Sequence, residues 1–159
     1  MTSRFTFRKA TPELGARPVM ARHSIPANLA ALSAIRHLVT EACIETGLDG
    51  SATYRLTLAV DEIATNIITH GYQEQGLTGD IVISIEAEDD KLTVILEDTG
   101  VAYDPRARDM PTAEDLDKPL SERDIGGLGI YLALQGVDRF DYQRCDQVNR
   151  NILEVERPR

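Results

Sequence analysis

A carboxylate and a carboxamide stand four residues apart in the sequence, at Glu62 and Asn66. In a helix this spacing places both side chains on one face, one turn apart. Their oxygen atoms could hold a hydrated Mg²⁺ together, or orient a water molecule or hydroxyl group for proton transfer. The same spacing is common on solvated helix faces, so the pair on its own favours an ordinary polar helix edge.

A second candidate, Asp98-Thr99-Gly100, directly follows an apolar segment. A carboxylate at a strand end can accept a hydrogen bond from the amino group of a nucleobase. A glycine there allows a flat ring to approach the backbone closely. As an isolated pattern, the same residues are typical of any turn that ends a strand.

The third candidate is the glycine-rich segment Gly126-Gly127-Leu128-Gly129, which leads into a short apolar stretch. Small residues at a helix start expose backbone N–H groups that can bind phosphate. No Gly-Lys-Ser/Thr follows, so the segment is not a P-loop, and the dinucleotide-binding spacing of glycines is absent. A plain turn from loop to helix remains an equal alternative.

Hydrophobic periodicity predicts the elements that would position these residues. The pattern indicates an α+β fold: a two-layer sandwich with a mixed, mostly antiparallel sheet and helices on one face. Gly47 and Gly71 are expected to end the two long helices, and Leu132 is expected in the core. The expected elements are a strand over 20–25, a helix from Pro26 to about Thr46, a helix from Asp49 to His70, strands over 81–85 and 92–96, a helix over 130–136, and strands near 139–144 and 151–156.

Two segments stand apart from this scaffold. Residues 1–20 form a mildly basic arm that we expect to precede a domain over 21–159. The polar stretch from Gly100 to Ile125 contains three prolines. Because loops of this length are uncommon inside compact domains, the stretch favours a lid or a binding loop.

Composition limits the partners. The chain has 159 residues, enough for about one domain, and a formal net charge of −9. Such a charge disfavours direct nucleic-acid binding and adhesion to an anionic membrane. Most of the excess lies between residues 86 and 124, with 13 acidic and 5 basic residues. No apolar run is long enough to span a bilayer. We expect a cytoplasmic protein without a signal peptide, in which Cys43 and Cys145 remain thiols.

The order of the three candidates resembles the GHKL (Bergerat-type) ATP-binding fold. Three segments also resemble boxes of the RsbW-type anti-sigma-factor serine kinases, and the likeness covers roughly residues 22–155. These segments are Leu58 to Tyr72, Asp98 to Pro105 and Gly127 to Leu132.

The resemblance implies ATP and Mg²⁺ as cofactors and gives the candidates roles. Asn66 would ligate Mg²⁺, and Glu62 would be the general base that activates a serine hydroxyl. Asp98 would bind the adenine amino group, with Gly100 beneath the base. Three further residues would support the lid and the phosphates: Gly127, Gly129 and Arg123, the last of which would reach the γ-phosphate.

By the same resemblance, the protein would be a serine/threonine kinase and anti-sigma factor. It would phosphorylate a small antagonist on Ser or Thr and sequester a sigma factor in alternation. Kinases of this type are often dimeric, which leaves a homodimer open. A non-catalytic, ATP-gated protein-binding module is the alternative, although such a module would not need Glu62. The catalytic half of a histidine kinase is disfavoured, because no histidine is followed by an acidic residue.

Overall fold

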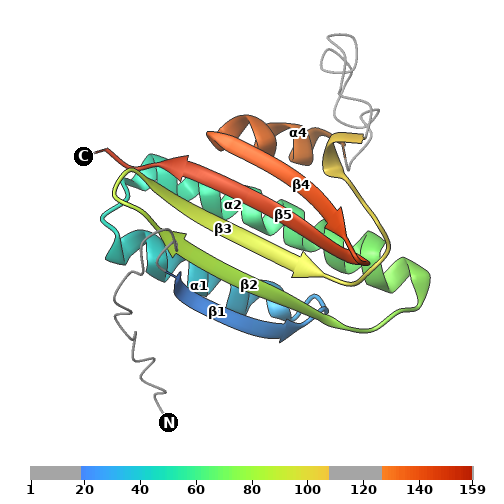
Figure 1. The fold of residues 1–159 in the computed structure, drawn as a ribbon. Coiled ribbons are helices and arrows are strands. Elements are labelled where there is room, and N and C mark those ends of the chain that lie inside the picture. The colour runs from blue at the N-terminus through green and yellow to red at the C-terminus, as the bar shows by residue number, and fades with distance from the viewer. Residues whose placement is uncertain (1–18, 108–126, 159) are drawn as a thin grey trace, which may run out of the picture.

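In the computed structural model, the strands form one five-stranded sheet with helices on one of its faces (Figure 1). The structure describes residues 19–107 and 127–158. Strand order is β1-β2-β3-β5-β4. Within these residues every neighbouring pair is antiparallel, so the sheet is not mixed. The strands are β1 (Val19–Pro26), β2 (Asp80–Ala87), β3 (Lys91–Asp98), β4 (Arg139–Cys145) and β5 (Val148–Glu156).

Three helices form the second layer. Helix α1 (Ala31–Glu45) packs beside α2 (Gly50–Asn66), and α2 packs beside α4 (Gly127–Gly136). Figure 1 shows all three behind the sheet, whose other face carries no helix in the described part of the chain. The expected α+β sandwich with helices on one face is therefore confirmed.

Local sequence explains how the two long helices start and stop. Gly47 adopts a left-handed conformation with φ of 68° just after α1, so it ends the helix as expected from the sequence. Asp49 then caps α2, because its side chain accepts a hydrogen bond from the Ala52 N–H at 2.8 Å. In α1, Ile35, Val39 and Cys43 recur at helical spacing and are at most 1% exposed.

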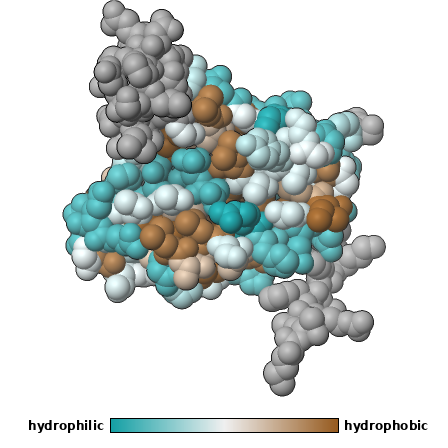
Figure 2. Space-filling view, turned by 180° about the vertical axis from the view of Figure 1, so that it is seen from behind, coloured by the Kyte–Doolittle hydropathy of each residue, from teal (hydrophilic) through white to brown (hydrophobic). Residues whose placement is uncertain are grey.

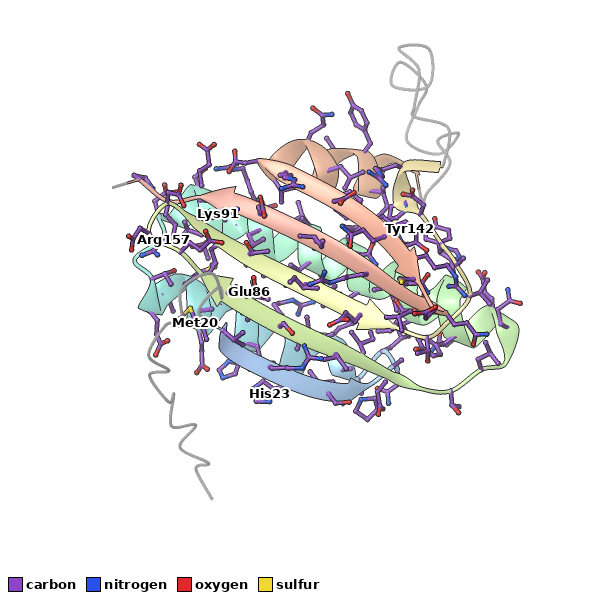
Figure 3. The ribbon with its side chains drawn as sticks, in the orientation of Figure 1. Met20, His23, Glu86, Lys91, Tyr142 and Arg157 are labelled. Carbon is purple, nitrogen blue, oxygen red and sulfur yellow. The ribbon has the colours of Figure 1, made fainter. Side chains whose placement is uncertain are left out.

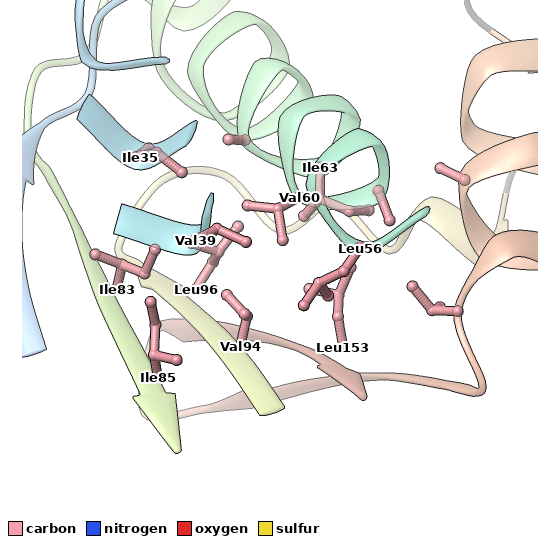
Figure 4. Close-up of a cluster of buried hydrophobic side chains, with 14 of the residues drawn as sticks. Ile35, Val39, Leu56, Val60, Ile63, Ile83, Ile85, Val94, Leu96 and Leu153 are labelled. Carbon is pink, nitrogen blue, oxygen red and sulfur yellow. The ribbon is translucent and has the colours of Figure 1, made fainter. Parts of the chain in front are cut away.

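The core lies between the two layers (Figure 4). Alternate residues of β2 and β3 point at the helices, because side chains along a strand alternate between faces. Ile83, Ile85 and Val94 meet Val39 and Val60 there, and each of the five is at most 1% exposed. Burying one such side chain contributes about 1.5–3 kcal/mol, so this contact holds α1 and α2 against the sheet.

The end of the second helix differs from the expectation. Helix α2 ends at Asn66, and the chain continues as a π-helical turn, η1 (Ile67–Tyr72), instead of stopping at Gly71. Tyr72 holds this turn: it is 1% exposed, and its hydroxyl donates to the Asp80 carbonyl and accepts from the Thr99 N–H. The left-handed residue that follows is Gly76, with φ of 63°. Gly71 therefore lies inside this turn and does not end the helix.

Other boundaries shift by a few residues. Helix α4 begins at Gly127, three residues earlier than expected, and β5 begins at Val148. Leu132, expected in the core, is 52% exposed on α4, so that expectation is wrong.

Figure 2, which views the molecule from the helical side, shows apolar residues there in separate patches among polar ones. No helix among the described residues has both the length and the apolar character that crossing a membrane requires.

Candidate functional site

Three segments far apart in the sequence meet along one side of α2. The second half of α2 with η1 lies between the start of α4 and the loop that leaves β3. At two of these contacts the segments lie so close together that only a glycine fits. These glycines are Gly129 in α4 and Gly100 in the loop after β3. We call the first the helix end of the site (Glu62, Asn66 and Gly129). The second is the strand end (Asp98, Gly100 and Asn149).

At the helix end, the Glu62 carboxylate lies directly against the backbone of α4. A Cβ atom at Gly129 would stand 2.7 Å from Glu62 Oε2 and 3.0 Å from its Cδ. Only a residue without a side chain therefore leaves the carboxylate where it is. From the sequence, only a family resemblance connects these two residues, and the structure places them in contact.

Asn66 lies one turn further along α2 and is half-buried. Its Nδ2 atom is buried and has no hydrogen-bond partner in the part of the chain that the structure describes. A buried polar group left without a partner is costly, and such groups usually acquire one from a ligand, an ion or water. The side chain is therefore suited to holding a group from outside the protein.

The metal-binding capacity of this end is limited. Within the described residues, no group of three histidine, cysteine, aspartate or glutamate side chains could hold a metal ion. Mg²⁺ suits such a place, because it keeps several waters and is usually bound by one or two protein oxygens plus substrate phosphates. The carboxamide of Asn66 and the carboxylate of Glu62 supply oxygens of the right kind, so the residues fit a magnesium–phosphate ligand.

At the strand end, Asp98 is 4% exposed. Its Oδ1 atom accepts hydrogen bonds from the Gly100 N–H and from Asn149 Nδ2, both at 2.9 Å. Among the described residues Oδ2 has no hydrogen-bond partner, so one acceptor oxygen of this carboxylate remains available.

The loop after Asp98 approaches η1 as closely as backbone allows. A Cβ atom at Gly100 would stand 2.7 Å from the Gly71 carbonyl oxygen and 3.0 Å from its carbon. The Val101 N–H donates to the same oxygen at 3.1 Å. Gly100 is therefore needed for this close packing, whereas a Cβ atom at Gly71 would meet nothing nearer than 3.9 Å. On the outer side of this contact, the rings of His70 and Tyr103 stack with centroids 5.0 Å apart.

Sequence reasoning missed Asn149, which reaches Asp98 from the neighbouring strand. Residues 98 and 149 are register partners in the β3–β5 pair. The Asn149 carboxamide accepts from Arg144 Nη1 at 2.7 Å and from the Tyr142 hydroxyl. Figure 3 shows Tyr142 on β4, the strand that pairs with the side of β5 away from β3.

Burial raises the pKa of both carboxylates. The pKa of Glu62 is raised from its ordinary value, first by burial and then by the neighbouring charge of Asp61. Burial also raises the pKa of Asp98, and the hydrogen bonds from Asn149 and Gly100 and the charge of Arg144 oppose that rise. Glu62 is therefore a stronger base than an exposed glutamate.

The structure brings together Glu62 with Gly129, and Asp98 with Gly100, while Asn66 lies between the two pairs along α2 and η1. Gly127 is the first residue of α4, where backbone N–H groups are free of the helix ladder. Arg123 lies outside the described residues.

Comparison with known proteins agrees with this arrangement. The family model described as "Histidine kinase-like ATPase domain" matches residues 25–156. A "Serine-protein kinase RsbW" of Bacillus cereus (strain AH187) is 30% identical over 109 residues, which cover 68% of this chain and 67% of the relative. The RsbW of Halalkalibacterium halodurans is 26% identical over 126 residues, covering 79% of this chain and 76% of the relative.

A solved structure has the same fold. It is the SiaB–SiaC complex from Pseudomonas aeruginosa, with a TM-score of 0.59 and 14% sequence identity over 87% of this chain and 89% of the other. Two backbone segments approach α2 and η1 closely, at Gly129 and at Gly100. Together with the order of the segments and these similarities, this geometry leads to one conclusion. The chain belongs to the histidine kinase-like ATPase domain family and resembles its RsbW-type members.

Proposed function

We propose that this protein is a Mg-ATP-dependent protein serine/threonine kinase that modifies a small partner protein. One observation carries the proposal most directly. The half-buried Glu62 carboxylate, with a raised pKa, stands one helical turn from the half-buried Asn66 amide, whose Nδ2 has no hydrogen-bond partner among the described residues. A general base beside a buried amide donor suits phosphoryl transfer to a hydroxyl group, because a phosphate or water oxygen could accept from that amide.

Glu62 would accept the proton of the partner's serine or threonine hydroxyl. A general base works best when its pKa lies near the working pH, and burial moves the pKa of Glu62 in that direction. Gly129 supports this role, because it lets the carboxylate lie against α4 in a fixed position. The family resemblance adds the same assignment for Glu62.

Asn66 would hold Mg²⁺ through its amide oxygen, and Asp98 with Gly100 would hold the adenine ring. Bound Mg-ATP would supply the phosphoryl group and a cation that offsets its charge. The N–H groups at Gly127 and Gly129 would face the phosphates, and Arg123 would add a positive charge there. Positioning and charge compensation of this kind supply most of the rate in phosphoryl transfer.

The identity of the partners rests on the relatives. Because the curated relatives are RsbW serine-protein kinases, we propose a small antagonist protein with a Ser or Thr acceptor as the substrate. A sigma factor would be the protein held when the antagonist is absent. This pair of partners implies a cytoplasmic protein that exchanges one partner for the other.

The test combines transfer with partner exchange. The full chain is incubated with γ-labelled Mg-ATP and a candidate antagonist from a neighbouring reading frame, and a pull-down with and without ATP follows. We expect labelled serine or threonine on the antagonist, and none with Glu62→Ala. ATP binding and partner exchange without any labelled protein would instead identify a non-catalytic, ATP-gated binding module.

A further inference from the structure

The Asn149 side chain is the most heavily hydrogen-bonded buried amide at the strand end, and nothing in the proposed mechanism uses it. It is 2% exposed. Its Nδ2 group donates to Asp98 Oδ1 at 2.9 Å, to the Gly100 carbonyl at 3.0 Å and to the Val101 carbonyl at 3.4 Å. One side chain of β5 therefore holds the end of β3 and the loop that follows.

Two groups of β4 fix which way this amide points. Arg144 Nη1 and the Tyr142 hydroxyl both donate to Asn149 Oδ1. A flipped amide would place its NH₂ group against the Arg144 cation and its oxygen against the Asp98 carboxylate. Both contacts would be repulsive, so the amide has one orientation and its Nδ2 always faces Asp98.

This orientation determines what Asp98 can offer a ligand. With Oδ1 filled by Asn149 and by the Gly100 N–H, the carboxylate can turn only Oδ2 outward. The charged and titratable groups around it include Arg144 and Tyr142 from β4 and Tyr72 from η1, whose hydroxyl binds the neighbouring Thr99 N–H. Burial raises the pKa of Asp98, and the hydrogen bonds from Asn149 and Gly100 and the charge of Arg144 oppose that rise. These partners therefore favour the ionised carboxylate, which accepts and does not donate.

We infer that Asn149, oriented by Arg144 and Tyr142, is the positioning residue that makes the site select purines bearing an amino group over purines bearing a carbonyl group at the same position. The inference rests on the proposed nucleotide site. An ionised carboxylate accepts from the amino group of adenine and repels the carbonyl oxygen of hypoxanthine. A protonated carboxyl group could donate to that oxygen, and the discrimination would disappear.

The experiment measures binding of Mg-ATP and Mg-ITP to the full chain by calorimetry, across a range of pH. Wild type should bind ATP about 10- to 100-fold more tightly than ITP, the usual effect of a hydrogen bond to a charged group. In Asn149→Leu, which has nearly the same shape but no donor, the ATP preference should fall to near one. The pH below which ATP binding weakens should also rise.

Asn151→Leu is the matched control. Asn151 lies two residues along β5 on the same face, is 1% exposed, and its Oδ1 has no hydrogen-bond partner in the described chain. It should keep the wild-type preference and pH profile. An Asn149→Leu protein that binds both nucleotides more weakly by the same factor, with an unchanged pH profile, would overturn the inference, because that is the result of a purely structural role.

Arg144→Gln is a second variant that tests the inference if Asn149→Leu does not fold. Because Arg144 is exposed, its substitution should leave folding intact. It should shift the ATP preference and the pH profile in the same direction by a smaller amount, and an unchanged preference would overturn the inference. A different result would refute the proposed kinase function. A wild type that selects ATP but transfers no phosphate to any partner would refute the kinase and leave the role of Asn149 in place. A wild type that binds neither nucleotide would refute both.

Discussion

The two ends of the site differ in how completely their polar groups are paired. At the strand end, Asp98 Oδ1 has two donors, and the Asn149 amide is bonded at both its oxygen and its nitrogen. At the helix end, the buried Asn66 Nδ2 has no hydrogen-bond partner in the described part of the chain, and the Glu62 carboxylate has no hydrogen bond from any residue there.

This difference indicates that the two ends of the site have separate roles. An unmade hydrogen bond of a buried group costs about 1–3 kcal/mol, so the helix end is kept in a costly state that a ligand can relieve. At the strand end the Asn149 amide and Asp98 Oδ1 are already paired, and Asp98 Oδ2 is left as the acceptor for a ligand. We therefore assign recognition to the strand end and chemistry to the helix end, and substitutions should separate the two.

The largest expected effect comes from removing the base. Glu62→Gln keeps the size of the side chain but cannot accept the hydroxyl proton. Phosphoryl transfer should fall about 10²- to 10⁴-fold, while ATP binding, measured by calorimetry, should persist. Transfer at the wild-type rate would remove the chemical role from the helix end.

The next effect tests the contact between Glu62 and α4. Gly129→Ala adds a Cβ atom that would stand 2.7 Å from Glu62 Oε2, so the carboxylate must move. Displacing a catalytic group by about 1 Å can cost about 10²-fold, and kcat should fall by up to that amount.

Gly136→Ala is the control on the same helix. Its added Cβ would meet Arg55 Cβ at 3.6 Å, an ordinary contact. Equal kcat values for the two alanine variants would show that the position of Glu62 against α4 does not matter.

At the strand end, Gly100→Ala should weaken both folding and ATP binding. The added Cβ would stand 2.7 Å from the Gly71 carbonyl, and backbone atoms cannot move aside as a flexible side chain can. Overpacking of this kind costs about 1–3 kcal/mol, which urea unfolding would measure.

Gly50→Ala meets nothing within 4 Å at the start of α2 and is the control. It should be at least as stable as the wild type, because alanine favours a helix over glycine. A Gly100→Ala protein of equal stability would contradict the close approach of the two backbones.

The smallest effect concerns pH. The acidic limb of the rate profile should reflect Glu62, whose pKa lies above its ordinary value of 4.5. Asp61→Asn removes the second cause of that rise, so Glu62 would lose its proton at lower pH and the limb should move to lower pH. Arg36→Gln, which breaks the 2.7 Å pair with Asp61 but keeps its charge, should not lower the limb. A limb that stays in place or moves up in Asp61→Asn would contradict this electrostatic account.

Local patterns were sufficient to predict much of the fold and the candidates. The helical spacing of Glu62 and Asn66 placed both at the edge of the buried face of α2, where they lie half-buried. The β-branched runs of β2 and β3 predicted the central hairpin, and Gly47 predicted the end of α1. Each of these depends on residues close together in the chain.

The misses depend on contacts between distant segments. Gly71 was expected to end a helix, but the wide turn that Tyr72 holds continues through it, and its carbonyl oxygen meets Gly100, 29 positions along the chain. Asn149 meets Asp98 only because β5 pairs with β3 in that register. One signal was present: Asn149 and Asn151 stand in phase with the buried Leu153 and Val155, so two amides lie on an otherwise apolar strand face.

The measurement that most directly tests the division of the site is the Mg²⁺ dependence of ATP binding. The chain carries a net charge of −9, so general attraction cannot hold a polyanion. If the helix end is completed by Mg²⁺ on Asn66, calorimetry should show much tighter binding of ATP to the wild type with Mg²⁺ than with excess EDTA. Asn66→Ala should lose most of that difference. Equal affinity of the wild type for ATP with Mg²⁺ and with EDTA would contradict the account.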